Sequence, residues 1–276
     1  VTLNGTPILT SDFTWKTSIN FSTNKNKIVK LHDELKELVY GPTSFSSSYA
    51  MKLVKGGSIG DIYGYKLKRA PDGQVVWKDG ITARTTEFEY VGNAYPAWKA
   101  GFSNEFSYKN FRVSILFDGQ WGGIVYSQTH HKMTEHGTLK HTLKYRENPN
   151  FEVVGEGVML DERGQYVPNN VPISVSKYYA DYWRRANVET NSFDASFLKL
   201  REARIEYTIP SAGLNKIGIE RLTLALYGRN LAMWTKDFPV YDPEVATLNN
   251  GTIVPGSEMG QLPSTRTMGF NLTLKF

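Results

Sequence analysis

Four of the five histidines lie close together in the sequence: His130, His131, His136 and His141. No other group of residues in the chain comes nearer to the type and spacing of metal ligands. Imidazole is a common ligand of transition metals, but protein metal sites combine it with further ligands at regular spacings. Here no acidic or cysteine partner follows such a spacing, and the motif His-Glu-x-x-His is absent. We therefore interpret these residues as solvated loop histidines and predict no metal site and no cofactor.

Other chemistry is sparse. The chain has no cysteine, which excludes thiolate nucleophiles, thiolate metal sites and disulfides. The segments Asp72-Gly73 and Asp161-Glu162-Arg163-Gly164 lack the alternating ligand positions of a calcium-binding loop and are typical of turns. The net charge of +5 is modest and the basic residues are scattered, so no nucleic-acid partner is indicated. We predict that the chain is not an enzyme.

A cluster of aromatic and basic residues is the strongest candidate for a binding surface. Aromatic rings presented by a loop can stack on sugar rings or grip peptide side chains, and rings combined with arginine are typical of binding hot spots. The same rings could instead anchor their loop against neighbouring protein, and the sequence leaves both interpretations open. The candidate contacts for a substrate or a capping protein are Tyr178, Tyr179, Tyr182, Trp183, Arg184 and Arg185.

Strands must position such loops, and the strand pattern is clearest at the end of the chain, in Thr267–Phe276. Apolar and polar side chains alternate there, and in a β-strand this alternation sends them to opposite faces. We predict that Phe270, Leu272, Leu274 and Phe276 face lipid while Asn271, Thr273 and Lys275 face inward.

The same alternation recurs upstream. The predicted strands run well beyond the usual five or six residues and approach the length of about ten that a tilted barrel strand needs to cross a membrane. No run of about 18 apolar residues occurs, so a transmembrane helix is not predicted. On the inward face, Glu202, Arg204 and Glu206 are expected to pair across neighbouring strands. The predicted upstream strands are Val1–Leu3 (the end of a strand), Phe13–Thr23, Trp98–Tyr108, Phe111–Tyr126, Phe197–Ile209 and Leu222–Trp234.

Short and long connections alternate between these strands. The connections at 108–111 and 210–218 are short, whereas 127–192 and 236–264 are long and rich in Gly, Pro, Asn and Asp. Outer-membrane barrels have short periplasmic turns and long extracellular loops, and this order puts every short turn on one side. The stretch 24–97 could form a hairpin above the membrane or an additional spanning pair of strands. The sequence therefore predicts an all-β fold, a transmembrane antiparallel β-barrel with long extracellular loops.

Several phrases, in this order, resemble the C-terminal half of the SusC/RagA family of TonB-dependent outer-membrane transporters. They are Asp12-Phe13-Thr14-Trp15, Asn20-Phe21-Ser22, Gly92-Asn93-Ala94-Tyr95-Pro96-Ala97-Trp98, Tyr108-Lys109-Asn110-Phe111, Phe117-Asp118-Gly119-Gln120, Asp194-Ala195-Ser196-Phe197-Leu198-Lys199-Leu200-Arg201-Glu202, Gly228-Arg229-Asn230-Leu231, Asp242-Pro243-Glu244 and Pro263-Ser264-Thr265-Arg266-Thr267.

The resemblance implies a large barrel closed by a plug, of which residues 1–276 would be the C-terminal portion without the plug and the first strands. It implies uptake of a large nutrient, a glycan or a peptide, across the bacterial outer membrane. The implied partners are a SusD-like surface lipoprotein, TonB acting through the missing N-terminal part, the rest of the same barrel and outer-membrane lipid.

A second function class is also compatible with alternating strands: a secreted, soluble β-sandwich that binds carbohydrate through exposed aromatic residues. The two differ in their surface. A barrel segment exposes its Phe, Leu and Trp faces as a continuous apolar band, whereas a sandwich buries them between two sheets.

Overall fold

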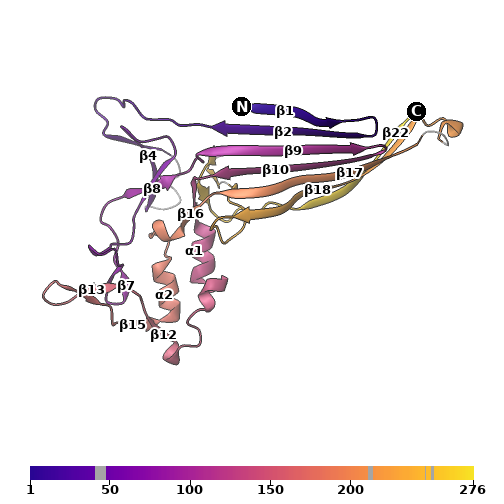
Figure 1. Cartoon of the computed structure of the whole chain (residues 1–276). Helices are drawn as coiled ribbons and strands as arrows, with labels where there is room; N and C mark the ends of the chain where they lie inside the picture. The colour runs from indigo at the N-terminus through magenta and orange to yellow at the C-terminus, as the bar shows by residue number, and fades with distance from the viewer. Residues whose placement is uncertain (41–47, 211–213, 246, 250–251) are drawn as a thin grey trace.

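The computed structural model describes residues 1–40, 48–210, 214–245, 247–249 and 252–276. Parts of three predicted connections, at 41–47, 211–213, 246 and 250–251, lie outside the described residues. A long, curved sheet forms one part of the molecule, and a lobe of helices and short strands lies at one end of it (Figure 1).

The sheet has seven antiparallel strands, in the order β1-β2-β9-β10-β17-β18-β22. It is open, with β1 and β22 at its two edges. Neighbours along this order are also consecutive long strands in the chain, as expected when short turns force adjacent pairing. The strands are β1 (Thr2–Leu9), β2 (Phe13–Thr23), β9 (Trp98–Tyr108), β10 (Phe111–Trp121), β17 (Phe197–Ile209), β18 (Arg221–Thr235) and β22 (Thr267–Lys275).

The predicted pairings are confirmed: β9 pairs with β10 and β17 pairs with β18. The short turns and the chain end at β22 lie at one end of the sheet, and the long connections lie at the other (Figure 1). In the turn between β9 and β10, Lys109 has a φ of 53°, a left-handed conformation that is typical of tight turns.

Two predicted strand limits were wrong. The first strand extends over Thr2–Leu9 rather than ending at Leu3. The strand that starts at Phe111 ends at Trp121, not at Tyr126. Gly122 and Gly123 both have a φ of 80°, which a β-strand does not permit, so the chain turns out of the sheet at this point. Beyond it, β11 (Ile124–Ser127) pairs with β16 (Ser192–Asp194) and β21 (Ser257–Glu258) in a separate small sheet.

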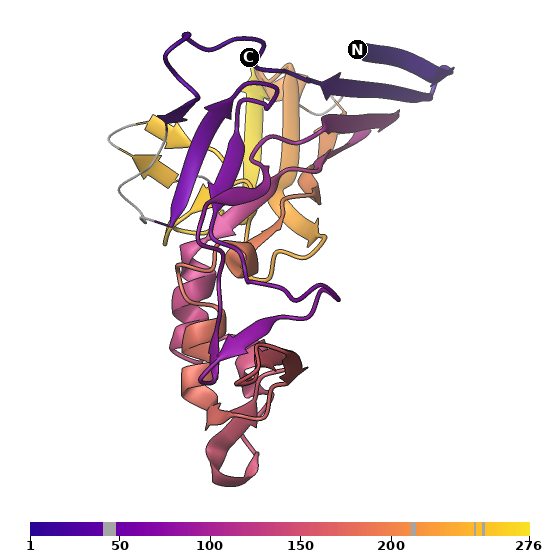
Figure 2. The same cartoon turned by 90° about the vertical axis from the view of Figure 1, so that its left-hand side faces the viewer.

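The long connections are not plain loops, because they fold together into the lobe (Figures 1 and 2). Its helices are α1 (Gln128–Glu135) and α2 (Val175–Tyr182), with 3-10 turns at Lys140–Leu143, Pro149–Phe151 and Glu189–Asn191. A further 3-10 turn, Asn215–Ile217, lies in the connection between β17 and β18. The remaining strands are β3 (Glu37–Tyr40), β4 (Tyr49–Val54), β5 (Asp61–Gly64), β6 (Val76–Lys78), β7 (Ile81–Thr82), β8 (Glu89–Asn93), β12 (Glu152–Val154), β13 (Val158–Leu160), β14 (Tyr166–Pro168), β15 (Pro172–Ser174), β19 (Thr247–Asn249) and β20 (Thr252–Val254).

The stretch 24–97 contributes strands to the lobe. Its strands β4 and β5 pair as a hairpin within a four-stranded sheet of order β3-β4-β5-β8. Its other strands are β6, which pairs with β13, and β7, which pairs with β6. Its described strands are therefore all outside the seven-stranded sheet, which favours the hairpin over an additional spanning pair.

The lobe has its own apolar core. One cluster gathers Trp77, Val153, Ile173 and Tyr179 around α2, and another gathers residues such as Tyr49, Met51 and Tyr126 beside β11. Both helices are short, and isolated helices of this length are marginal in water, so packing must hold them. Ser127 and Ser174 cap them by accepting a hydrogen bond from the N–H three residues on. Neither helix, nor any other described one, is long and apolar enough to cross a membrane.

Candidate functional site

One face of the seven-stranded sheet is apolar and exposed. Strand register places side chains of alternating positions in rows that run across the sheet, such as Trp15, Phe106, Val113, Ile205, Leu226 and Phe270. Leu226 is 63% exposed and Phe270 is 78% exposed. A polar amide in this face, Asn104, accepts a hydrogen bond from the indole N–H of Trp15 at 2.9 Å. The alternation predicted from the sequence thus produces one continuous apolar surface.

Aromatic side chains lie at both ends of this apolar face. Near the turns, the rings of four neighbouring strands share one row, and the Phe111 and Tyr207 centroids are 4.6 Å apart. Near the lobe, Trp98 and Trp121 stack with their centroids 6.3 Å apart and their planes within 9°. We call these groups the turn belt, formed by Phe13, Tyr108, Phe111 and Tyr207, and the lobe belt, formed by Trp98, Trp121 and Trp234.

The opposite face of the sheet is polar and carries a ladder of ion pairs. Glu105 on β9 lies 3.7 Å from Lys16 on β2 and 3.9 Å from Arg112 on β10. Arg112 lies 3.8 Å from Glu206, which also pairs with Arg204. Glu202 pairs with Arg229 on β18 at 2.9 Å. The predicted pairing across neighbouring strands is therefore confirmed for Glu202 and Glu206, whereas Arg204 pairs with Glu206 on its own strand.

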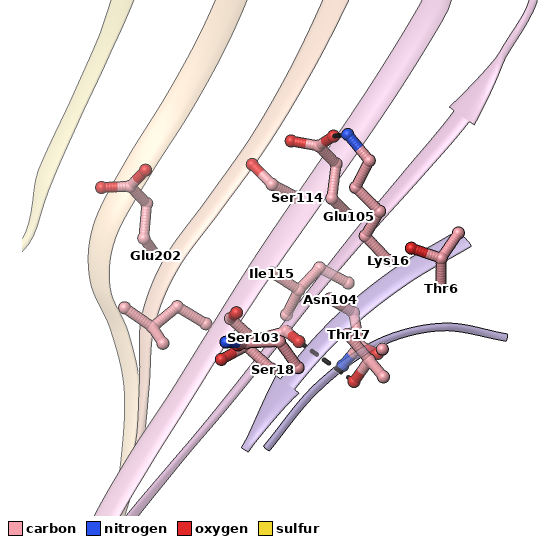
Figure 3. Close-up of a pocket in the computed structure, with 13 residues that line it drawn as sticks. Thr6, Lys16, Thr17, Ser18, Ser103, Asn104, Glu105, Ser114, Ile115 and Glu202 are labelled. Carbon is pink, nitrogen blue, oxygen red and sulfur yellow. Dashed lines mark hydrogen bonds and ion pairs between the residues drawn. The ribbon is translucent and has the colours of Figure 1, made fainter. Parts of the chain in front are cut away.

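Short polar side chains beside this ladder leave a hollow of about 610 Å³ on the β1, β2, β9 and β10 side. Figure 3 shows Lys16 and Glu105 meeting at one end of it, with Ser18, Ser103 and Thr17 at the other. Hydroxyl groups can both donate and accept hydrogen bonds, so this surface suits polar solutes.

A second charge network closes the polar face where it meets the lobe. Lys199 on β17 donates to both carboxylate oxygens of Asp242, at 2.6 and 2.7 Å, and also contacts Glu244. Arg201 bridges Glu244 and Asp118, with its shortest contact to each at 2.5 Å. Lys199 and Asp242 are 2% and 3% exposed. The network holds the turn at Asp242-Pro243-Glu244 against the sheet.

The predicted contact residues lie on α2 and just after it. Tyr178 and Tyr179 are buried in the lobe core, and Tyr182 and Trp183 are half-buried beside it. The ring of Tyr178 stacks on Trp77 at 6.1 Å, and burial raises the pKa of the Tyr178 hydroxyl well above its ordinary value. The four aromatic residues are thus together, but packing occupies most of their surface.

The two arginines differ from each other. Arg184 lies 3.4 Å from Asp181 and donates a hydrogen bond to the carbonyl of Thr82, so it braces α2 against β7. Arg185 is exposed. Of the six predicted contacts, Arg185 is the most accessible to another molecule.

The interpretation of the histidines as solvated was wrong for two of them. His130 and His131 are 2% and 5% exposed. His130 donates from Nδ1 to Oδ1 of Asn191 at 2.9 Å, and burial lowers its pKa to about 4. Its ring stacks on that of His141, with centroids 5.3 Å apart. Their helix α1 packs inward because it contacts α2, β21 and the 3-10 turn at Glu189–Asn191, and local polarity does not reveal these tertiary contacts. Among the described residues no group of three or more His, Asp or Glu side chains is placed to hold a metal ion.

Residues 56–60 read Gly-Gly-Ser-Ile-Gly and match the Gly-x-Ser-x-Gly pattern of hydrolases. That pattern works in a strand-to-helix turn that presents serine to a histidine base. Here it joins two strands, β4 and β5. The Ser58 hydroxyl donates to the side chain of Asn26 at 2.9 Å. The geometry therefore gives Ser58 a structural role.

Comparison with known proteins agrees with this architecture. No family model matches the chain. TonB-dependent receptor P3 of Formosa agariphila is 27% identical over 303 residues, which cover 99% of this chain and 28% of the receptor. Receptor P26 of the same organism is 28% identical, with 99% of this chain and 28% of the receptor covered. A structure of the RagAB peptide transporter matches all of this chain and 28% of its own, with a TM-score of 0.65 and 19% identity.

The chain is similar over nearly its whole length to part of TonB-dependent receptors, and it shares the fold of part of the RagAB peptide transporter. A structure of the RagAB peptide importer in the open-open state gives a TM-score of 0.64 at 20% identity, covering 100% of this chain and 28% of that one. The chain spans about 28% of the length of the relatives named here.

The ion network of Lys199, Asp242 and Glu244 was not predicted, because its members are about 43 residues apart. The only sequence signal is the pair of charged residues Lys199 and Arg201 at alternate positions of one strand, facing the polar side.

Proposed function

We propose that the seven-stranded sheet is a section of the wall of a transmembrane β-barrel that imports a nutrient, with residues 1–276 forming one portion of that barrel domain. The observation that carries this proposal is the pair of aromatic belts. Phe111 and Trp121 lie ten positions apart on β10, which corresponds to roughly 34 Å along a strand. At the tilt of about 40° that is usual in barrels, this spans about 26 Å, close to the apolar band of about 25 Å in outer-membrane barrels.

In this proposal the polar face lines the lumen, and the strands missing from the circle pair with the free edges of β1 and β22. The lumen would then present the ion-pair ladder and the hydroxyl-rich hollow to a passing solute. A large nutrient, a glycan or a peptide, fits this hydrogen-bonding surface, and the RagAB structures provide a precedent for peptides. TonB would supply the energy, acting on a part of the receptor outside this chain.

The lobe would lie outside the cell and contact a SusD-like surface lipoprotein, the substrate or both. Its long connections all emerge from the end of the sheet that carries the lobe belt (Figure 1). We infer that Tyr178 and Tyr179 act by fixing α2, while Tyr182, Trp183, Arg184 and Arg185 form the surface that α2 offers. Arg185 supplies the accessible charge.

The soluble sandwich is disfavoured by a specific observation. A sandwich must cover the apolar face of each sheet with the other. Here Leu226 and Phe270, which lie on that face on β18 and β22, remain well over half exposed.

Arginine substitutions on the apolar face test the barrel. Ile115 lies on this face between the turn belt and the lobe belt, and Leu272 lies on the same face of β22. An arginine on the lipid face near the midplane costs about 2–4 kcal/mol. We expect Ile115→Arg and Leu272→Arg in the intact receptor each to impair membrane assembly.

Ser114→Arg, on the polar face of the same strand, is the control and should assemble as the parent does. The readout is the amount of receptor in the outer-membrane fraction. Equal assembly of Ile115→Arg and Ser114→Arg would contradict the assignment of the apolar face to lipid.

A further inference from the structure

A charged hollow lies on the polar face of the sheet, at the end of β9 and β10 that meets the lobe. Strand register puts Lys99 and Asp118 on the face that carries Ser103 and Glu105, opposite the apolar face. The volume of about 440 Å³ is within the range of roughly 300–1,000 Å³ that is usual for ligand pockets. The walls of this charged hollow include Ser22, Lys99, Asp118, Arg201 and Glu244.

One side of the charged hollow has a surplus of negative charge. Arg201 pairs with Asp118 and Glu244. Lys199 pairs with Glu244 and with Asp242, which is buried. Three carboxylates thus share two cations, and the side chains of Asp118 and Glu244 line the hollow and are each 35% exposed. Because opposite charges attract strongly at short distances, this side of the hollow favours a further cation, such as an ammonium group.

The other side of the charged hollow carries an unpaired cation. Lys99 is exposed, and its ammonium has no ion pair or hydrogen bond within the described part of the chain. Lys99 faces Gln120 in the register, so Asp118 is its diagonal neighbour across the two strands, at roughly 7–8 Å. Arg201 already pairs with Asp118, which leaves Lys99 free to bind an anion from outside the chain. The hydroxyl of Ser22, opposite Lys99 on β2, adds a hydrogen-bond donor beside it.

We propose that the charged hollow binds a short peptide by both of its termini. Asp118 and Glu244 receive the ammonium group, and Lys99 and Ser22 receive the carboxylate. Two extended residues span about 7 Å, which matches the separation of roughly 7–8 Å between Lys99 and Asp118. A neutral sugar of the same size offers no charge to either side, so it would displace water from these groups without pairing them, which is costly.

The inference rests on the proposed function, since the polar face lines the lumen only if the sheet is part of a barrel wall. The lobe then lies outside the cell, and the charged hollow is at the outer end of the lumen, where a solute enters. The peptide site narrows the proposed cargo, a glycan or a peptide, to a peptide.

Isothermal titration calorimetry of the intact receptor in detergent tests the proposal. The probes are dialanine, its C-terminal amide, its N-acetyl derivative and maltose. We expect dialanine to bind about tenfold more tightly than either blocked form, because each terminus makes a charge-assisted hydrogen bond, and more tightly than maltose. Lys99→Gln should weaken dialanine binding about tenfold, for the same reason, and leave binding of the amide unchanged, since the amide has no carboxylate to lose.

Lys25→Gln is the matched control, because it removes an exposed lysine that does not line the charged hollow. If Lys99→Gln and Lys25→Gln bind dialanine equally, or if Lys99→Gln weakens the amide as much as dialanine, the peptide site is overturned. It is also overturned if the parent binds dialanine no more tightly than maltose. None of these results bears on the barrel, which fails separately if Ile115→Arg assembles in the membrane as Ser114→Arg does.

Discussion

At the scale of single residues, the charges buried at the edge of the lobe are satisfied by partners distant in sequence. Lys199 faces Asp242 and Glu244, and Arg201 faces Glu244 and Asp118. Removing one member of such a buried group leaves its partners uncompensated, which is more costly than the net stabilisation that the group provides.

Lys199→Met should therefore destabilise the receptor by about 3–5 kcal/mol. Lys275→Met is the control, because Lys275 and Glu220 form an exposed pair, with side chains 68% and 58% exposed, and such pairs contribute about 0–1 kcal/mol. Urea unfolding of the intact receptor in detergent measures both. Equal midpoints for the two variants would show that the Lys199 network contributes no more than a surface ion pair.

His130 gives the lobe a dependence on pH. Burial lowers its pKa from 6.5 to about 4 in the folded chain, so between these values the unfolded chain binds a proton that the folded chain does not. The stability it contributes is complete above about pH 6.5 and decreases, by up to about 3 kcal/mol, as the pH falls towards 4. The pKa of His131 is lowered in the same direction by burial.

We expect hydrogen exchange in α1, corrected for the intrinsic effect of pH, to be faster at pH 5 than at pH 7. His130→Gln cannot titrate and should show a smaller difference between the two conditions. An unchanged difference would assign the pH dependence to other groups, with His131 the first to examine.

At the scale of elements, the lobe is a packed unit that depends on several long connections at once. Val158 on β13 lies beside Val76 on β6, more than eighty positions earlier in the chain. Deleting 147–172 to test the binding role of the lobe would remove Val153 and Val158 from its core. A surface substitution is therefore the better test of the α2 region.

Arg185→Glu reverses the accessible charge beside α2 without touching the core. If this surface captures the lipoprotein partner, affinity should fall by about tenfold or more, as expected at a binding hot spot. Arg163→Glu, at the exposed turn between β13 and β14, is the matched charge reversal. Pull-down of the partner from solubilised membranes gives the comparison, and equal capture by the two variants would remove α2 from the contact surface.

At the scale of the whole molecule, the two ends of the sheet should face different compartments. The chain has no cysteine, so single cysteines can report which side of the membrane each end occupies. Glu162→Cys lies in the lobe, and Asn110→Cys lies in the short turn between β9 and β10. A maleimide that cannot cross membranes should label Glu162→Cys in intact cells and Asn110→Cys only after the outer membrane is opened. The reverse order would invert the proposed orientation.

The sequence by itself determined the long strands, their pairing and the division of the sheet into apolar and polar faces. Side chains alternate with a period of two, and short turns force neighbours to pair, so both features are local. It also carried the resemblance to SusC/RagA receptors, because phrases such as Gly92–Trp98 and Asp194–Glu202 keep their order along the chain.

Only the tertiary structure decided what the long connections do. The burial of Tyr178 and His130, the end of β10 at Gly122 and the partners of Lys199 all depend on contacts between segments that are far apart in the chain. Such contacts produce no periodic pattern in the sequence, since each joins two surfaces at one place and does not recur along the chain.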